Sequence, residues 1–267
     1  MPVPLRRFSQ NWLANDELAI ALVGAIAPRE GDHFLEIGPG EGRLTRAILA
    51  HPVRVTAIEV DRRCCEALRE LSAGLGDGPA GLEVVEASVL DFDPKQLHEA
   101  QLRFVGNLPY AIASPILRWT ALHHGLVVDV HYMVPADVAE RMLAQPGSSA
   151  RGVISVMIDW FFEGSIVRRL GPGAFRPEPK IDSAFVRLRP HDPPACDSSA
   201  AHRRAVVGAA FAHRLKTLAN SLRKVGWERP AIESALAAAT VPEKARAEEL
   251  AVGQFARLIE TLPELSP

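Results

Sequence analysis

A short turn at the end of an apolar run contains the residues of this chain that are best suited to chemistry. The run, Leu102 to Val105, is typical of a buried strand in a parallel sheet, and the turn is Asn107-Leu108-Pro109-Tyr110. A side-chain amide oxygen and a rigid backbone carbonyl can each accept one N–H of an amine. These two hydrogen bonds would pull the nitrogen of a conjugated amine, such as that of adenine, toward tetrahedral geometry. The lone pair of the nitrogen would then point at an electrophile. Pro109 fixes the carbonyl before it, and Tyr110 offers a flat face to an unstacked base.

A glycine-rich loop, Glu36-Ile37-Gly38-Pro39-Gly40-Glu41-Gly42, follows a predicted strand and begins a helix. Glycines at such a position let the backbone approach a ligand closely. A dinucleotide-binding loop has the spacing G-x-G-x-x-G or A, but Arg43 occupies the last position of that pattern here. The Glu36 carboxylate also disfavours a pyrophosphate and suits a cationic ligand. We therefore expect S-adenosylmethionine, and Glu59 at the end of the next strand could bind both of its ribose hydroxyls.

The elements that must position these two segments alternate between strand and helix. Strands are expected at 33–37, 53–59, 82–86, 102–105, 128–134, 153–162 and 183–189. Helices are expected at 16–27 with a cap at Asn15 or Asp16, and at 43–50, 62–71, 114–123 and 136–143. This order predicts an α/β fold with a doubly wound, mostly parallel, seven-stranded Rossmann-like sheet.

A proline-rich stretch, 190–195, separates this part from a second that is helical to its end. Helices are expected there near 200–211, 216–224, 230–239 and 252–262. We therefore expect a methyltransferase domain at 1–190 and a small all-α domain at 191–267, in which the basic residues given below would bind RNA.

Composition narrows the class of protein. The chain has 267 residues, 48% of them hydrophobic and 23% charged, which is ordinary for a globular protein. A net charge of −2 means that any nucleic-acid contact must come from local basic patches. Three cysteines exclude a disulfide framework, no Cys/His spacing predicts a metal site, and we expect a cytoplasmic protein. Asp16 and Glu17 before the first apolar run argue against a secretory signal, and no run is long enough for a membrane span.

Four further motifs make the chain similar to the ribosomal RNA adenine dimethylases over nearly its whole length. They are Arg7-Phe8-Ser9-Gln10-Asn11-Trp12-Leu13 for R-F-G-Q-N-F-L; residues 175–184 for F-x-P-x-P-K-V-D-S-A; Ala210-Phe211, Arg214, Lys216-Thr217-Leu218 and Asn220 for A-F-x-x-R-x-K-T-L-x-N; and Arg246 to Leu250 for R-x-E-x-L. The loop and the full helical part look more like the small-subunit type. This resemblance implies dimethylation at N6 of two adjacent adenosines near the 3′ end of small-subunit rRNA, by a monomer that acts on the immature 30S particle.

The resemblance also implies roles for individual residues. Those expected to bind S-adenosylmethionine, and its product S-adenosylhomocysteine, are Asn11, Leu13, Glu36, Gly38, Gly40, Glu59, Ser88 and Asn107. Those expected to hold or contact the target base are Asn107, Leu108, Pro109, Tyr110 and Phe175, the last as a wall opposite Tyr110.

The chain departs from the family pattern at several positions. Ser88 stands where the family has an aspartate that binds the adenine amine of the cofactor. A hydroxyl accepts that N–H more weakly than a carboxylate does, so we expect weaker cofactor affinity. Other departures, expected where RNA or the target base would pass, are Ala111, Pro135, Asp137, Arg151 and Leu215. These leave the exact RNA target open.

Three basic clusters could bind RNA. The first lies in a segment without acids and comprises Arg203, Arg204, Arg214, Lys216, Arg223 and Lys224. The second comprises Arg168, Arg169, Arg176, Lys180, Arg187 and Arg189, and the third Arg6 and Arg7. A run of charged residues is usually only a solvated face of the protein. RNA binding is the favoured explanation if all three clusters flank one cleft. In that case the affinity for RNA should depend steeply on salt concentration.

Three other functions stay open. The chain could be a large-subunit rRNA adenine methylase or a diverged paralogue with another RNA target. It could be a non-catalytic ribosome-assembly factor. The replacement of the family aspartate by Ser88 is consistent with this hypothesis, whereas the intact Asn107 turn argues against it. A methyltransferase of small molecules is disfavoured by the basic helical part.

Overall fold

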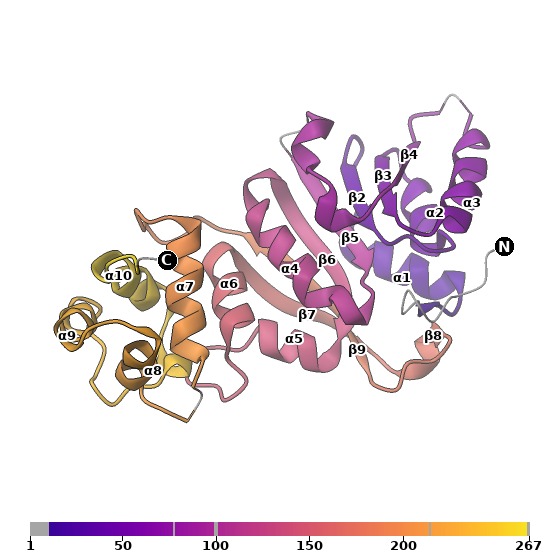
Figure 1. The fold of residues 1–267 in the computed structure, drawn as a ribbon. Coiled ribbons are helices and arrows are strands. Elements are labelled where there is room, and N and C mark those ends of the chain that lie inside the picture. Colours follow the sequence, from indigo (N-terminus) through magenta and orange to yellow (C-terminus); the bar gives the residue numbers. More distant parts are fainter. Residues whose placement is uncertain (1–10, 77, 99–100, 214, 266–267) are drawn as a thin grey trace. The chain divides into compact units, whose positions relative to one another are not determined.

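The computed structural model describes residues 11–76, 78–98, 101–213 and 215–265. It forms two compact units, each described here by itself (Figure 1). The sheet unit comprises Met1–Ala139 with Glu163–Pro190, and the helical unit comprises Glu140–Phe162 with His191–Pro267. The division of function between 1–190 and 191–267 stays a prediction, but by packing the segment 140–162 belongs with the C-terminal helices.

The sheet has seven strands in the order β4-β3-β2-β5-β6-β9-β7 (Figure 1). In chain order they are β2 (His33–Ile37), β3 (Arg54–Glu59), β4 (Gly81–Glu86), β5 (Leu102–Asn107), β6 (Val127–Pro135), β7 (Phe162–Leu170) and β9 (Ser183–Pro190). β2 to β6 are parallel and β9 pairs antiparallel with β6. The predicted doubly wound, mostly parallel sheet is confirmed.

The strand order explains why the two candidate segments meet. After β2 the chain builds β3 and β4 on one side, then crosses over to build β5 and β6 on the other. The carboxyl ends of β2 and β5 are therefore neighbours at the point where the order reverses, which is where open α/β sheets bind ligands. Every residue of β2 is buried, as a central strand covered on both faces requires.

Helices of the sheet unit lie close to the expected positions. They are α1 (Asp16–Ile26), α2 (Arg43–Leu49), α3 (Arg62–Ala73), α4 (Ala113–Leu122) and α5 (Ala136–Met142), the last running into the helical unit. Short 3-10 turns are η2 (Val89–Asp91), η3 (Pro94–Leu97), η4 (Tyr110–Ile112), η5 (His124–Leu126) and η6 (Pro172–Ala174). The Asn15 side chain caps α1 by accepting a hydrogen bond from the Leu18 N–H at 2.9 Å.

A two-stranded antiparallel sheet was not expected from the sequence. It joins β1 (Trp12–Leu13) to β8 (Phe175–Arg176), with Trp12 opposite Arg176 and Leu13 opposite Phe175. This pairing fixes the segment just before α1.

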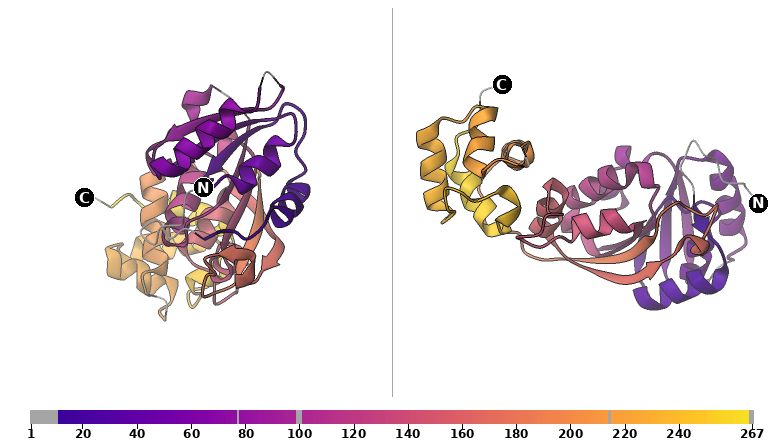
Figure 2. Two further views of the ribbon diagram at one scale, coloured as in Figure 1. Left: turned by 90° about the vertical axis from the view of Figure 1, so that its right-hand side faces the viewer. Right: turned by 90° about the horizontal axis from the view of Figure 1, so that it is seen from below.

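The helical unit packs α7 (Ala200–Phe211), α8 (Leu218–Val225), α9 (Arg229–Ala238), η7 (Ala247–Glu249) and α10 (Val252–Thr261) around one core (Figure 2). Trp227, 2% exposed, lies in this core and donates its indole N–H to the Pro263 carbonyl at 2.9 Å. In the part of the chain that the structure describes, no helix is long and apolar enough to cross a membrane.

The strand expected at 153–162 is wrong. These residues form α6 (Val153–Phe161), and β7 begins only at Phe162. β-Branched residues favoured a strand, but a helix lets Val156 and Trp160 pack into the core of the helical unit. Ser155 supports the first turn by accepting a hydrogen bond from the Gly152 N–H at 2.9 Å.

Candidate active site

A cavity of about 230 Å³ lies at the carboxyl ends of the parallel strands. Predicted residues that line it are Asn11, Gly38, Gly40, Glu59, Ser88, Asn107, Leu108 and Pro109. Ala111, expected where RNA or the target base would pass, also lines the cavity. Further lining residues, missed by sequence reasoning, are Trp12, Ile37, Ile58, Val60, Ala87, Val89, Ile112 and Ile116. Four predicted residues, Leu13, Glu36, Tyr110 and Phe175, are not part of this lining.

The glycine loop follows β2 and has a left-handed backbone. The φ angle is 65° at Gly38 and 57° at Gly40, values that favour glycine. A β-carbon on Gly38 would lie 3.8 Å from Cδ of Pro109, so the loop and the Asn107 turn are packed together. A β-carbon on Gly40 would lie only 2.5 Å from Nε1 of Trp12. The absence of a side chain at Gly40 therefore lets the Trp12 indole pack directly against the loop.

Glu59 links the loop to the end of β3. One carboxylate oxygen accepts the Gly40 N–H at 3.1 Å, and the other accepts the N–H groups of Val60 and Asp61 at 2.8 and 2.9 Å. Burial raises the pKa of Glu59, and these backbone donors oppose the shift. A carboxylate has about four acceptor sites, so one remains for a ligand hydroxyl.

Glu36 is buried, 1% exposed, and does not line the cavity. Burial raises the pKa of its carboxyl to about 7, and the nearby Glu59 carboxylate adds to the shift. The expected ionised carboxylate facing the loop is therefore partly protonated near neutral pH. Glu36 lies in β2 just before the loop, and its role toward a ligand stays a prediction.

The Asn107 turn ends β5 and has one fixed orientation. The Asn107 amide donates from Nδ2 to the carbonyl of Asn11 at 2.6 Å. A carbonyl only accepts, so the amide nitrogen must face Asn11, and Oδ1 is left to accept from another donor. The Leu108 N–H donates to the Met133 carbonyl at 3.0 Å, and Pro109 has φ −58°. The Leu108 carbonyl is therefore held by a backbone that is fixed on both sides.

Tyr110 lies beside the turn, and its phenol hydrogen-bonds the hydroxyl of Ser183 at the start of β9. Burial raises the pKa of this phenol. Phe175 is 1% exposed in the core next to Leu13. Its predicted role as a wall for the base has no support from this placement.

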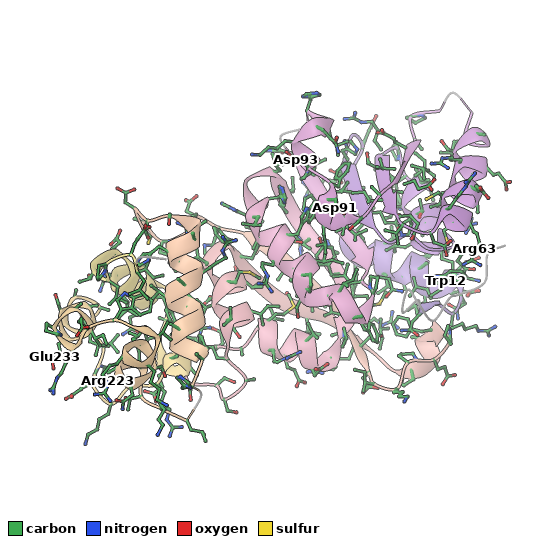
Figure 3. The ribbon with its side chains drawn as sticks, viewed as in Figure 1. Trp12, Arg63, Asp91, Asp93, Arg223 and Glu233 are labelled. Carbon is green, nitrogen blue, oxygen red and sulfur yellow. The ribbon has the colours of Figure 1, made fainter. Side chains whose placement is uncertain are left out.

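Ser88 lines the cavity directly after β4. Its hydroxyl already accepts a hydrogen bond from the Leu90 N–H at 3.3 Å, so it caps the short turn η2. Asp91, labelled in Figure 3, is exposed and outside the lining, and does not replace the missing carboxylate.

The first basic cluster maps onto the helical unit. Arg203 and Arg204 lie in α7, Arg223 and Lys224 lie in the last turn of α8, Lys216 precedes α8, and Arg214 lies outside the described residues. Arg204, Lys216, Arg223 and Lys224 are exposed, and Figure 3 shows Arg223 at the surface of α8. Arg203 donates to the Ser198 carbonyl at 2.9 Å and lies 6.0 Å above the Trp160 ring. It therefore also has a packing role.

The expected location of Arg151, where RNA or the target base would pass, is wrong. Arg151 is 0% exposed and donates to the carbonyls of Ala144 and Leu250 at 2.7 and 3.2 Å, and to the Asp159 carboxylate at 2.7 Å. A buried guanidinium satisfies acceptors that would otherwise be unpaired. Arg151 stabilises the helical unit, whereas Leu215 is 86% exposed.

The sequence of the chain matches one known protein family over almost its whole length. A sequence model of the family described as ribosomal RNA adenine dimethylase matches residues 5–264. The chain belongs to this family. Ribosomal RNA adenine dimethylases are S-adenosylmethionine-dependent methyltransferases, so the cavity at the glycine loop is the expected cofactor site.

Relatives of the dimethylase align over almost its whole length. A protein named ribosomal RNA small subunit methyltransferase A from Acidithiobacillus ferrooxidans is 38% identical over 270 residues, covering 99% of this chain and 96% of the relative. The protein of the same name from Xanthomonas oryzae pv. oryzae is 40% identical over 260 residues, covering 97% and 96%.

Two solved structures are similar to the dimethylase. A dimethyladenosine transferase from Plasmodium falciparum has TM-score 0.75 and 24% identity, covering 92% of this chain and 95% of that one, which supports the fold. The 23S rRNA methyltransferase ErmE has TM-score 0.68 and 28% identity, covering 94% and 99%.

Proposed function

We propose that this dimethylase transfers methyl groups from S-adenosylmethionine to N6 of two adjacent adenosines near the 3′ end of small-subunit rRNA. The observation that carries the assignment is the similarity, over nearly the full length of both chains, to relatives named ribosomal RNA small subunit methyltransferase A. The substrate would be an immature 30S particle, and the enzyme would act on it as a monomer in the cytoplasm.

The residues of the cavity fit this cofactor. Gly38 and Gly40 line the cavity without side chains, and Glu59 retains an acceptor site for a ribose hydroxyl. Ser88 places a hydroxyl on the wall, where the family has a carboxylate. When bound, the cofactor supplies a methyl group that is already activated on a sulfonium.

The Asn107 turn would hold the target amine. Asn107 Oδ1 and the Leu108 carbonyl would each accept one N–H of the adenine N6 amine. Because the Asn11 carbonyl takes the amide N–H, the amide cannot rotate and offer the wrong group. In the first transfer, holding both N–H bonds aims the nitrogen lone pair, and this positioning supplies most of the acceleration. The methylated nitrogen then releases one proton, so in the second transfer the amine has one N–H left for one of these two acceptors.

Tyr110 and the helical unit would hold the RNA. The Tyr110 ring, fixed by Ser183, would stack on the adenine pulled out of its helix. The exposed cations Arg204, Lys216 and Arg223 would bind phosphates without reading sequence.

Transfer of radiolabelled methyl groups tests this function. The acceptors are undermethylated 30S particles, 50S particles and free small-subunit rRNA. We expect label in the 30S sample, at N6-dimethyladenosine near the 3′ end, and none after Asn107→Ala. The control Asp91→Asn changes an exposed residue outside the cavity and should transfer as the parent does.

The large-subunit alternative has one supporting observation, the similarity to the 23S rRNA methyltransferase ErmE. Label in the 50S sample and none in the 30S sample would establish that alternative and overturn the small-subunit proposal.

A further inference from the structure

Trp12 contributes an unused polar group to the cavity wall. The residue lies in β1, is 8% exposed and lines the cavity (Figure 3). Its Nε1 is buried, and among the described residues none accepts a hydrogen bond from it. Buried donors are almost always paired, so an unpaired one beside a ligand cavity requires an explanation.

Trp119 and Trp227 show the usual arrangement. The indole of Trp119 donates to the Phe92 carbonyl at 3.1 Å, and that of Trp227 donates to the Pro263 carbonyl at 2.9 Å. In both, the protein itself supplies the acceptor for the indole N–H. Trp12 differs from both because no described residue accepts a hydrogen bond from its N–H.

The position of this N–H is fixed from two sides. The Asn11 carbonyl is bound by the Asn107 amide, and Trp12 itself pairs with Arg176 in β8. The indole nitrogen packs against the α-carbon of Gly40, where a β-carbon would approach it to 2.5 Å. A donor held this rigidly loses little entropy when a ligand binds.

The chemistry of the lining indicates which acceptor it would meet. S-adenosylmethionine has one anionic group, the carboxylate of its amino-acid end. Among the described residues no lysine, arginine or histidine lines the cavity, so that carboxylate has no cationic partner there. Glu59 is an acceptor with one site left, and it suits a ribose hydroxyl, which donates. An indole N–H is a donor only, and therefore suits the carboxylate.

We propose that Trp12 is a cofactor-binding residue whose indole N–H hydrogen-bonds the carboxylate of S-adenosylmethionine. This inference rests on the proposed function only for the identity of the cofactor, not of the RNA. The family segment R-F-G-Q-N-F-L has phenylalanine at this position, so the ring is shared and the N–H is an addition of this chain.

Trp12→Phe tests the proposal because it removes the N–H and keeps the packing of a ring. Calorimetry measures the affinity of two ligands, S-adenosylhomocysteine and 5′-methylthioadenosine, which lacks the amino-acid end. We expect about a tenfold loss of affinity for S-adenosylhomocysteine, the usual size for a hydrogen bond to a charged group. Affinity for 5′-methylthioadenosine should not change. The control Trp227→Phe should bind both ligands as the parent does.

Thermal unfolding separates binding from structure. The N–H of Trp12 is unpaired without ligand, so Trp12→Phe should leave the melting temperature of the free protein unchanged, and S-adenosylhomocysteine should raise it less than in the parent. Equal affinity of parent and Trp12→Phe for S-adenosylhomocysteine would overturn the proposal, as would an equal loss for both ligands. Failure of the parent to bind S-adenosylhomocysteine would refute the proposed function itself.

Discussion

Gly40→Ala should weaken cofactor binding by an amount that the structure lets us work out. The backbone there is left-handed, with φ 57°, a conformation that costs alanine about 1–2 kcal/mol. The new β-carbon would also lie 2.5 Å from Nε1 and 2.9 Å from Cδ1 of Trp12, which is buried. Relieving such an overlap typically costs about 1–3 kcal/mol. The free protein can relieve this strain by moving the loop away from Trp12, and cofactor binding must then restore the loop. The sum, about 2 kcal/mol or more, therefore corresponds to a loss of affinity of roughly 30-fold or more.

Calorimetric titration with S-adenosylhomocysteine measures this loss, and a double variant separates its two causes. In a Trp12→Ala background the overlap is absent, so adding Gly40→Ala should cost only the backbone term, about tenfold in affinity. Gly171→Ala is the matched control, because nothing lies within 4 Å of its β-carbon and its φ is −74°. The reasoning fails if Gly40→Ala binds as tightly as the parent, or costs as much with Trp12 absent as with it present.

Three further variants follow from the contacts described above. Asn107→Asp keeps an acceptor for the target amine but places a carboxylate oxygen against the Asn11 carbonyl, where the amide N–H now donates at 2.6 Å. The affinity for S-adenosylhomocysteine should fall about tenfold, and kcat should fall further. Unchanged affinity and kcat would show that this contact does not matter. Arg151→Met should lower the free energy of unfolding in urea by about 3–5 kcal/mol, because it leaves Asp159 and two carbonyls unpaired, while cofactor affinity stays the same. Burial raises the Glu36 pKa from 4.5 to about 7, so the folded state holds a proton that the unfolded state releases. Its contribution to the free energy of unfolding therefore falls as pH rises between these values, and Glu36→Gln should flatten that dependence; identical pH profiles of the parent and Glu36→Gln would contradict it.

Residues at strand ends could be placed from the sequence, because buried parallel strands have a strong apolar signal. The loop after Ile37 and the turn at Asn107 follow such strands, and the sheet brings them together at its switch point. The fold class followed from the same pattern. What the pattern could not give is the orientation of the Asn107 amide, which depends on a carbonyl 96 positions away in the chain.

The residues that were missed or misplaced lack a local signal. Trp12 belongs to a strand of two residues, too short for any periodicity, and only its neighbours Asn11 and Leu13 were predicted to belong to a site. Arg151 has the charge of an RNA contact but lies inside the helical unit, and residue type alone does not tell the two apart. The helix α6 replaced an expected strand because core packing overrode the β-branched residues between Val153 and Phe161.

The pairing of β1 with β8 has a consequence for synthesis of the protein. One wall of the cavity carries Asn11 and Trp12 from the beginning of the chain, yet their strand partner, Phe175–Arg176, emerges from the translating ribosome long afterwards. A nascent polypeptide that ends before Phe175 contains the glycine loop and the Asn107 turn, but it lacks the strand partner of Trp12 and Leu13. We therefore expect such a truncated chain to retain the methyl donor less well than the finished chain does.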